Sequence, residues 1–263
     1  MKKRPTVYDM HRLKGQRKLI ELHVDDALGA AAGEEVGIDM FSCEHDQTLP
    51  SIRAAAPSVF IQAGIAFGAV ASPEEGIRQG FAALAAGADC VYFSGSPRIL
   101  EAMAREGLPV TGHVGLVPDW ATWTNFRAVG RDPHEAAEVY RRMKTLENAG
   151  AWAVEVEVVP VRVAAFLTAN TRMITEGMGC GTACDTIYLF SSDVLGTNTG
   201  HYPRHTKKYG DIAKALDEVQ RLRVQAMAAF VADIRSGGYP EAKHQLDIDQ
   251  TAFEEFSHLV GRA

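Results

Sequence analysis

The sequence of 263 residues has few cysteines, no long apolar run and no excess of positive charge. Its four cysteines are too few and too scattered for a disulfide framework or a structural zinc, so they predict reduced thiols. With 27 Lys and Arg against 33 Asp and Glu, the net charge of -6 argues against nucleic acid as a partner. No apolar stretch is long enough to span a bilayer. We therefore expect a cytoplasmic protein with neither a nucleic-acid nor a membrane partner.

Three further patterns are missing. The first 18 residues carry positive charge but have no apolar centre, so they do not resemble a secretory signal. No GxGxxG follows the first predicted strand, which argues against a dinucleotide-binding open sheet. The chain has no internal repeat and no low-complexity linker. With 46% hydrophobic residues it is predicted to form one domain that buries a full core.

What the sequence does contain is a regular succession of short apolar stretches, each rich in Val, Ile, Phe or Leu and too short for a helix. They lie at 18–23, 38–43, 59–63, 90–93, 109–112, 152–159, 172–176 and 186–190. Helix-like segments, such as 72–86, 97–106 and 133–149, separate most of them. This alternation predicts an α/β protein with a (β/α)8 TIM barrel. We expect one domain over 1–263, with an N-terminal extension at 1–17 and a C-terminal helical region at 211–263 that serves packing or assembly.

The stretch 108–132 is the first candidate for a site. Its short apolar strand leads into Gly112 and His113, and a long polar and aromatic loop then closes on Arg131. Side chains at the carboxyl ends of parallel strands converge, so ligands are handled there. The alternative is a tight turn beside a histidine that is hydrogen-bonded in the core.

Glutamates on two neighbouring predicted strands form the second candidate. Glu155 and Glu157 lie on one face of the strand at 152–159, about 6.6 Å apart along it. Valines occupy the other face and suit packing against helices, so both acids are expected to point into the barrel. Glu176 ends the next strand and adds a third carboxylate. Such a set is typical of a hard-cation site or a general base, whereas an exposed edge fits eight parallel strands poorly.

Glu44, His45 and Asp46 follow the second predicted strand and are the densest run of ligand-type side chains in the chain. A loop that turns two of them toward one ion would make a metal site. The alternative is a solvated loop in which the aspartate caps a turn.

Several motifs together resemble the ketopantoate hydroxymethyltransferase family, which belongs to the phosphoenolpyruvate mutase and isocitrate lyase superfamily of barrels. They are GHVGLVPD at 112–119, VGRD at 129–132, LENAGAWAVEVEVVP at 146–160, GMGCGTACD at 177–185, SDVLG at 192–196 and PRHTKKYGDI at 203–212. The resemblance implies a divalent metal, usually magnesium, that binds a 2-oxo acid and stabilises its enolate. The enolate then adds to formaldehyde delivered by methylenetetrahydrofolate. The resemblance also implies that Glu157 is the catalytic glutamate and that His113 is the histidine of the family's GH motif.

The chain departs from the family where the metal and the substrate are bound. A metal aspartate and the serine after it are replaced by His45 and Asp46, and a second metal aspartate by Gly64. The substrate lysine and a nearby glutamate are replaced by Tyr92 and Ser94. These changes remove charges that hold a 2-oxo carboxylate and its enolate.

Two hypotheses about the site follow. In the first the metal site has moved, with Glu44, His45, Glu155 and Glu176 as ligands, and the imidazole favours a transition metal over magnesium. In the second, acid–base chemistry around Glu157 needs no metal.

We therefore expect a ketopantoate hydroxymethyltransferase-like enzyme that makes or breaks a carbon–carbon bond next to the carbonyl group of a small oxo acid. Glu157 is the expected base and His113 a polarising group or ligand. The residues expected to bind the substrate are Asp46, Tyr92, Ser94 and Arg131. A tetrahydrofolate-type one-carbon donor is expected only if the parent reaction is kept, and the resemblance suggests a homo-oligomer. The alternatives are a lyase, hydrolase or isomerase acting on another acid, and a non-catalytic binding protein on the same barrel.

Overall fold

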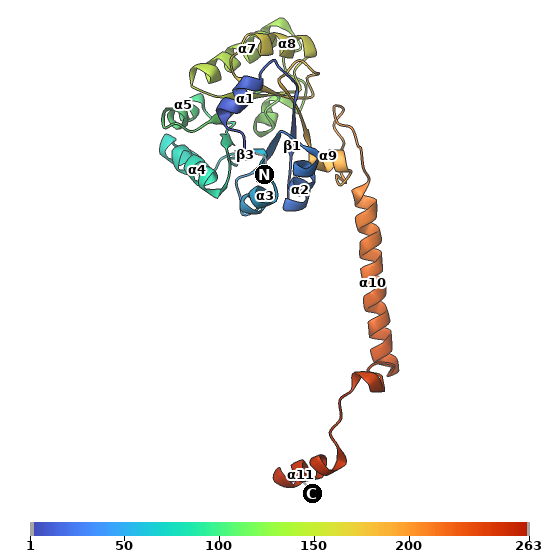
Figure 1. Cartoon of the computed structure of the whole chain (residues 1–263). Helices are drawn as coiled ribbons and strands as arrows, with labels where there is room; N and C mark the ends of the chain where they lie inside the picture. Colours follow the sequence, from blue (N-terminus) through green and yellow to red (C-terminus); the bar gives the residue numbers. More distant parts are fainter. Residues whose placement is uncertain (1–2, 262–263) are drawn as a thin grey trace. The chain divides into compact units, whose positions relative to one another are not determined.

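The computed structural model describes residues 3–261, so the first two residues of the predicted N-terminal extension and the last two of the C-terminal region lie outside it. Eight parallel strands form a closed barrel in sequence order (Figure 1). They are β1 Leu19–His23, β2 Met40–Glu44, β3 Phe60–Gly64, β4 Cys90–Tyr92, β5 Val110–Gly115, β6 Ala153–Glu157, β7 Ile174–Met178 and β8 Thr186–Phe190. The eight predicted strands and the TIM barrel are confirmed.

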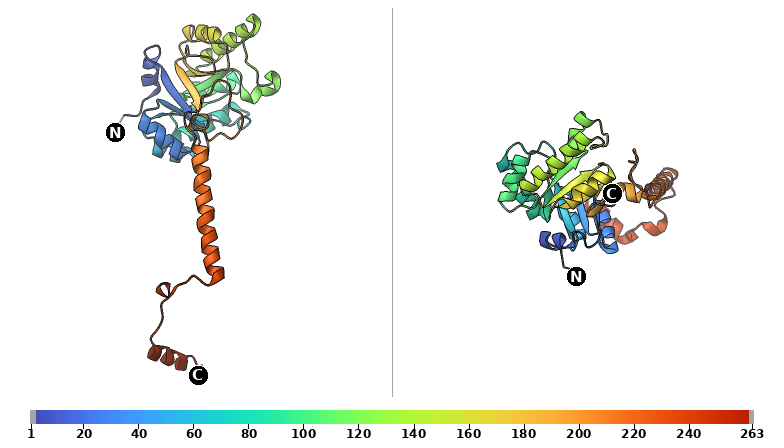
Figure 2. Two further views of the ribbon diagram at one scale, coloured as in Figure 1. Left: turned by 90° about the vertical axis from the view of Figure 1, so that its right-hand side faces the viewer. Right: turned by 90° about the horizontal axis from the view of Figure 1, so that it is seen from above.

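Helices follow most strands and lie on the outside of the barrel (Figure 2). Those before residue 210 are α1 Val7–Leu13, α2 Ala27–Val36, α3 Leu49–Ala55, α4 Pro73–Ala86, α5 Pro97–Arg105, α6 Ala121–Thr124, α7 Pro133–Asn148, α8 Val161–Ala169 and α9 Ser191–Leu195. A 3-10 turn, η1, covers Pro118–Trp120. Helix α4 begins as its sequence predicts, because Ser72 and Glu75 form a reciprocal capping box. Asp26 likewise caps α2 by accepting a hydrogen bond from the Gly29 amide at 2.7 Å.

The interior of the barrel changes from apolar to polar along the strands. At the amino-terminal end, side chains from the strands pack with Met10 of α1 and Trp152 into one apolar cluster. One step further along lie Glu21, Gln62 and Glu176, all fully buried. The carboxyl ends then carry the open polar cavity described below. This order agrees with the expectation that functional groups gather at the carboxyl ends of the strands.

The chain divides into two compact units, Met1–Gly210 and Asp211–Ala263. The second contains α10 Ile212–Ser236, the 3-10 turn η2 Ala242–His244 and α11 Gln250–Leu259. Its start coincides with the predicted C-terminal helical region, whereas the assignment of the whole chain to one domain stays a prediction. Across residues 3–261, no helix combines the length and the apolar composition needed to cross a membrane. All four cysteines are buried and free, as the sequence predicts.

Candidate active site

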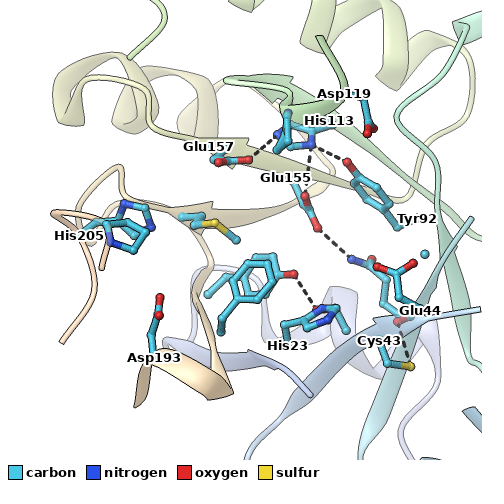
Figure 3. Close-up of a pocket in the computed structure, with 18 residues that line it drawn as sticks. His23, Cys43, Glu44, Tyr92, His113, Asp119, Glu155, Glu157, Asp193 and His205 are labelled. Carbon is cyan, nitrogen blue, oxygen red and sulfur yellow. Dashed lines mark hydrogen bonds and ion pairs between the residues drawn. The ribbon is translucent and has the colours of Figure 1, made fainter. Parts of the chain in front are cut away.

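A cavity of about 320 Å3 opens at the carboxyl ends of the strands (Figure 3). Every strand contributes to its wall, and so do the loops after β5 and α9. Its ionisable side chains are His23, Cys43, Glu44, Tyr92, His113, Asp119, Glu155, Glu157, Tyr188, Asp193 and His205. The predicted glutamate pair Glu155 and Glu157 therefore faces the interior, as strand alternation requires.

His113 lies at the centre of the charged groups and is 1% exposed. Its Nδ1 is 2.7 Å from the Tyr92 hydroxyl and 3.3 Å from Glu155 Oε2. Its Nε2 is 3.3 Å from Glu157 Oε2, but it forms no hydrogen bond in this arrangement. The strand register explains the contact, because Gly115 and His113 on β5 pair with Glu157 and Glu155 on β6.

The neighbours of His113 define which of its nitrogens carries the proton. Burial raises the pKa of Tyr92 well above its usual value, so the phenol keeps its proton and donates it to Nδ1. Burial also raises the pKa of Glu155, and the charges of Glu176 and Glu157 add to the effect. Both groups that face Nδ1 therefore carry a proton at neutral pH. Nδ1 therefore accepts, which assigns the ring proton to Nε2, the nitrogen that lies 3.3 Å from Glu157 Oε2.

A layer of buried polar groups lies beneath the cavity. The Gln62 amide nitrogen donates to Glu155 Oε1 at 3.4 Å and to Glu176 Oε2 at 3.2 Å. The Thr186 hydroxyl donates to Glu21 Oε2 at 3.1 Å, and one oxygen each of Glu21 and Glu176 has no hydrogen-bond partner among the described residues. Burial raises the pKa of Glu21 well above its usual value and that of Glu176 to about 8. These carboxyls are held as neutral acids, because burying a charge without a counterion costs more than keeping the proton.

The backbone around the site is tightly constrained. Gly115, the last residue of β5, has a φ of 94°, and a Cβ there would collide with the carbonyl oxygen of Glu157. Only glycine therefore lets β5 approach the end of β6 this closely. Gly179, with a φ of 68°, allows a similarly close approach of the His205 side chain. The His205 Nδ1 would lie 2.9 Å from a Cβ added at Gly179.

Only some of the predicted site residues lie in the wall of the cavity. Tyr92 and Glu44 reach the cavity. The Ser94 hydroxyl donates to Asp119 at 2.6 Å and thereby orients an acid of the wall. Asp46 accepts hydrogen bonds from the amide and hydroxyl of Thr48, at 2.7 and 2.6 Å, so it caps a turn as the alternative interpretation held.

The four proposed metal ligands are not brought together. Glu44 is in the wall of the cavity, and His45 is not among the lining residues. Glu155 also lines the cavity, Glu176 lies in the buried layer beneath it, and both accept hydrogen bonds from Gln62. Across residues 3–261, no group of three or more His, Cys, Asp or Glu side chains is arranged to hold a metal ion.

Some residues of the cavity wall and of the polar layer beneath it were not anticipated from the sequence. Glu21 stands in the strand LIELH, where alternation places it on the same face as Leu19, so an inward acid was foreseeable. Gln62 gives no such signal, because a single amide in an apolar strand is common. Asp193 lies on the short helix α9 and His205 in the loop after it, segments without a periodic pattern, and only the closed barrel places both side chains in the wall of the cavity.

A closed parallel barrel with carboxyl, imidazole and phenol groups converging at the carboxyl ends of its strands defines an enzyme of acid–base type on a TIM barrel. The profile described as ketopantoate hydroxymethyltransferase matches residues 12–242. The chain belongs to that family, and the expected transferase is confirmed.

Its curated relatives include three proteins named 3-methyl-2-oxobutanoate hydroxymethyltransferase. The protein of Frankia casuarinae is 35% identical over 76% of this chain and 68% of its own length. That of Thermus thermophilus is 30% identical over 92% of this chain and 99% of its own length. That of Chloroflexus aggregans is 28% identical over 94% of this chain and 95% of its own length.

Two solved structures show the same fold. The 2,3-dimethylmalate lyase, a member of the PEP mutase/isocitrate lyase superfamily, has a TM-score of 0.54 at 13% identity and covers 97% of this chain and 99% of its own. Phosphonopyruvate hydrolase, in complex with oxalate and Mg++, has a TM-score of 0.54 at 13% identity. The match covers 98% of this chain and 95% of the hydrolase chain. At this identity the likeness concerns the fold alone, and the expected superfamily stays a prediction.

Proposed function

We propose that this chain forms a carbon–carbon bond next to the carbonyl group of a small 2-oxo acid, by hydroxymethyl transfer, with Glu157 as the base. The observation that supports this most directly is the placement of His113 Nε2 3.3 Å from Glu157 Oε2, with protonated groups on its other nitrogen. A carboxylate beside a fixed imidazole N–H is suited to taking a proton from carbon and passing it on.

The chemical steps follow from these positions. Glu157 takes the proton from the carbon next to the carbonyl group, and the electron pair moves onto the carbonyl oxygen. Water first releases the one-carbon unit of a tetrahydrofolate-type donor as formaldehyde, and that donor belongs to this proposal. The carbon next to the carbonyl group then forms a bond to the formaldehyde carbon, and the formaldehyde oxygen takes the proton that Glu157 had removed. His113 Nε2 stabilises the charge on that oxygen through a hydrogen bond. The net result is transfer of one proton from the carbon to the new hydroxyl group, with free tetrahydrofolate as the second product.

A divalent metal is the least supported part of the expected chemistry. The donor set across residues 3–261 does not fit a protein site with three ligands, so no step above is routed through a metal. Magnesium, or a transition metal at a relocated site, remains a prediction, to be checked by elemental analysis of the purified wild type beside Glu44→Gln. The cytoplasmic location also remains a prediction.

The experiment that tests the proposal is hydrogen exchange on carbon. In D2O the wild type is expected to replace the hydrogen at C3 of 3-methyl-2-oxobutanoate with deuterium. Proton NMR measures the rate of this exchange as the loss of the C3 proton signal. Glu157→Gln removes the base and is expected to slow exchange by about 100-fold or more. The matched control is Glu106→Gln, because Glu106 is exposed at the end of α5 and lines neither cavity described here. Exchange at the wild-type rate in Glu157→Gln would contradict the proposal.

A further inference from the structure

A second cavity adjoins the first and shares part of its wall. It has a volume of about 600 Å3, and Glu157, Pro203 and His205 line both cavities. In Figure 3, Glu157 and His205 lie toward one side of the first cavity, away from Glu44 and Tyr92. The remaining residues of the second cavity are Leu116, Phe126, Ala128, Arg131, Val158, His201 and Arg204. Glu157 is thus accessible from two directions.

The two cavities have opposite charge. The lining of the first has five carboxyl side chains and no lysine or arginine among the described residues. The second has Arg131 and Arg204 together with two histidines, and Glu157 is its single carboxylate among the described residues. An anion is therefore repelled by the first cavity and attracted by the second.

The two arginines are anchored by their backbones and leave their side chains free for a ligand. The amide of Arg131 donates to Glu135 Oε2 at 3.2 Å, and the turn that holds Arg204 is closed by a 2.9 Å hydrogen bond from the Thr206 amide to the Pro203 carbonyl. Arg127 lies in the same loop as Arg131, and its guanidinium forms an ion pair with Glu135. Within residues 3–261, neither Arg131 nor Arg204 has such a partner.

Backbone strain is concentrated at the same cavity. The described residues include three non-glycine residues with a positive φ, and two of them, Phe126 at 53° and Val158 at 48°, line the second cavity. A β-branched residue rarely adopts this conformation. Val158 is held in it by a 2.8 Å hydrogen bond from its amide to Met178 and a 3.2 Å bond from the Val129 amide to its carbonyl. Strain that is fixed in this way is typical of functional sites.

We propose that the carboxylate of the oxo acid binds in this second cavity, between Arg131 and Arg204, and presents its reacting carbon to Glu157 at the shared wall. The first cavity then receives the uncharged one-carbon unit. This inference rests on the proposed function and names its carboxylate-binding residues. It also explains how a 2-oxo acid is held without a lysine or arginine in the first cavity, since guanidinium groups bind carboxylates through paired, charge-assisted hydrogen bonds.

The test compares two ligands that differ only in the carboxylate. Binding of 3-methyl-2-oxobutanoate and of 3-methylbutan-2-one is measured by calorimetry or NMR titration for wild type, Arg131→Ala, Arg204→Ala and the double variant. The ratio of the Kd of the oxo acid to the Kd of the ketone is expected to rise about 10-fold for each arginine removed. Arg78→Ala is the control, because Arg78 is exposed on α4 and lines neither cavity.

The outcomes separate this inference from the proposed function. If the double variant keeps the wild-type ratio while Glu157→Gln abolishes carbon exchange, the reaction stands and the carboxylate binds elsewhere, so the inference is overturned. If the ratio rises in the arginine variants but Glu157→Gln exchanges normally, the carboxylate site stands and the proposed base is wrong. A ratio that rises equally in Arg78→Ala would reflect general surface charge and would also overturn the inference.

Discussion

At the scale of single residues, His113 and the carboxyls below it form a chain of groups whose protons are fixed by burial. Tyr92 and Glu155 face one nitrogen of His113, and Glu157 faces the other. Gln62 then links Glu155 to Glu176. Burial raises the pKa of Glu155 and of Glu176, whereas Glu157, near the other nitrogen of His113, is the carboxyl proposed to take a proton.

A pH-dependent stability follows from Glu176. Its pKa of about 8 in the folded chain lies above the ordinary value of 4.5. Below pH 4.5 both the folded and the unfolded chain hold the proton. Between pH 4.5 and 8 the unfolded chain releases it first, so the contribution of Glu176 to stability is lost as the pH rises.

Glu176→Gln removes this titration. The measured quantity is the free energy of unfolding of the variant minus that of the wild type. We expect this difference to be larger at pH 8 than at pH 5 by on the order of 3 kcal/mol. Urea unfolding at the two pH values measures it, and any constant packing cost of the amide cancels in the comparison. The exposed Glu106→Gln is expected to show no such change. An equal difference at both pH values would mean that Glu176 is not a neutral acid in the folded chain.

At the scale of elements, the junction of β5 and β6 positions the base. Leu116 donates its amide hydrogen to the Glu157 carbonyl at 2.9 Å, and Gly115 makes room for that carbonyl. The carboxyl group proposed as the base is therefore placed by a backbone contact between neighbouring strands. Its side-chain neighbour His113 comes from the same strand as Gly115.

Gly115→Ala tests this junction. We expect it to lower the unfolding free energy by about 2 kcal/mol more than Gly107→Ala and to slow carbon exchange, because the added methyl group displaces Glu157. Gly107 is a matched control, since its φ of 84° is also left-handed but a Cβ there meets no atom within 4 Å. Equal losses of stability in both variants, with unchanged exchange, would show that the close approach is unimportant.

The elements also show how far sequence reasoning reached. The strands, the capped helices and the inward direction of Glu155 and Glu157 follow from alternation and end signals, which are local. The four proposed metal ligands illustrate the limit. His45 and Glu44 are adjacent in sequence, but only the end of β2 decides that one reaches the cavity and the other does not. The presence of Arg131 and Arg204 in the wall of one cavity depends on two irregular loops and has no local pattern.

At the scale of the whole molecule, the second unit carries an apolar stripe. Helix α10 buries none of its 25 residues. Six of its large exposed apolar side chains lie on one face, at spacings of three, four or eight positions: Ile212, Leu216, Val219, Met227, Phe230 and Ile234. Such a stripe on one helix face is typical of a helix–helix contact, and exposed apolar area of this extent marks an association surface. We predict that a second copy of the chain covers it, in keeping with the expected homo-oligomer.

Charges placed on the stripe are expected to separate the copies. Met227→Asp combined with Phe230→Asp should convert the wild-type oligomer to monomers in sedimentation-velocity experiments, because a carboxylate is costly to bury at an apolar contact. The control adds the same charge on the opposite face, as Gln225→Asp with Ala229→Asp. A wild-type chain that sediments as a monomer would contradict the prediction, as would equal dissociation in both double variants.

The apolar cluster at the amino-terminal end of the barrel also affects the order of events during turnover. Met10, Leu19, Met40, Phe60 and Trp152 pack there without polar groups between them, so reactants do not pass along the barrel axis. Reactants and product must then share the openings at the other end. Since the two reactants are proposed to occupy separate cavities at that end, either of them can bind first, and initial-rate kinetics are expected to show a random order of binding.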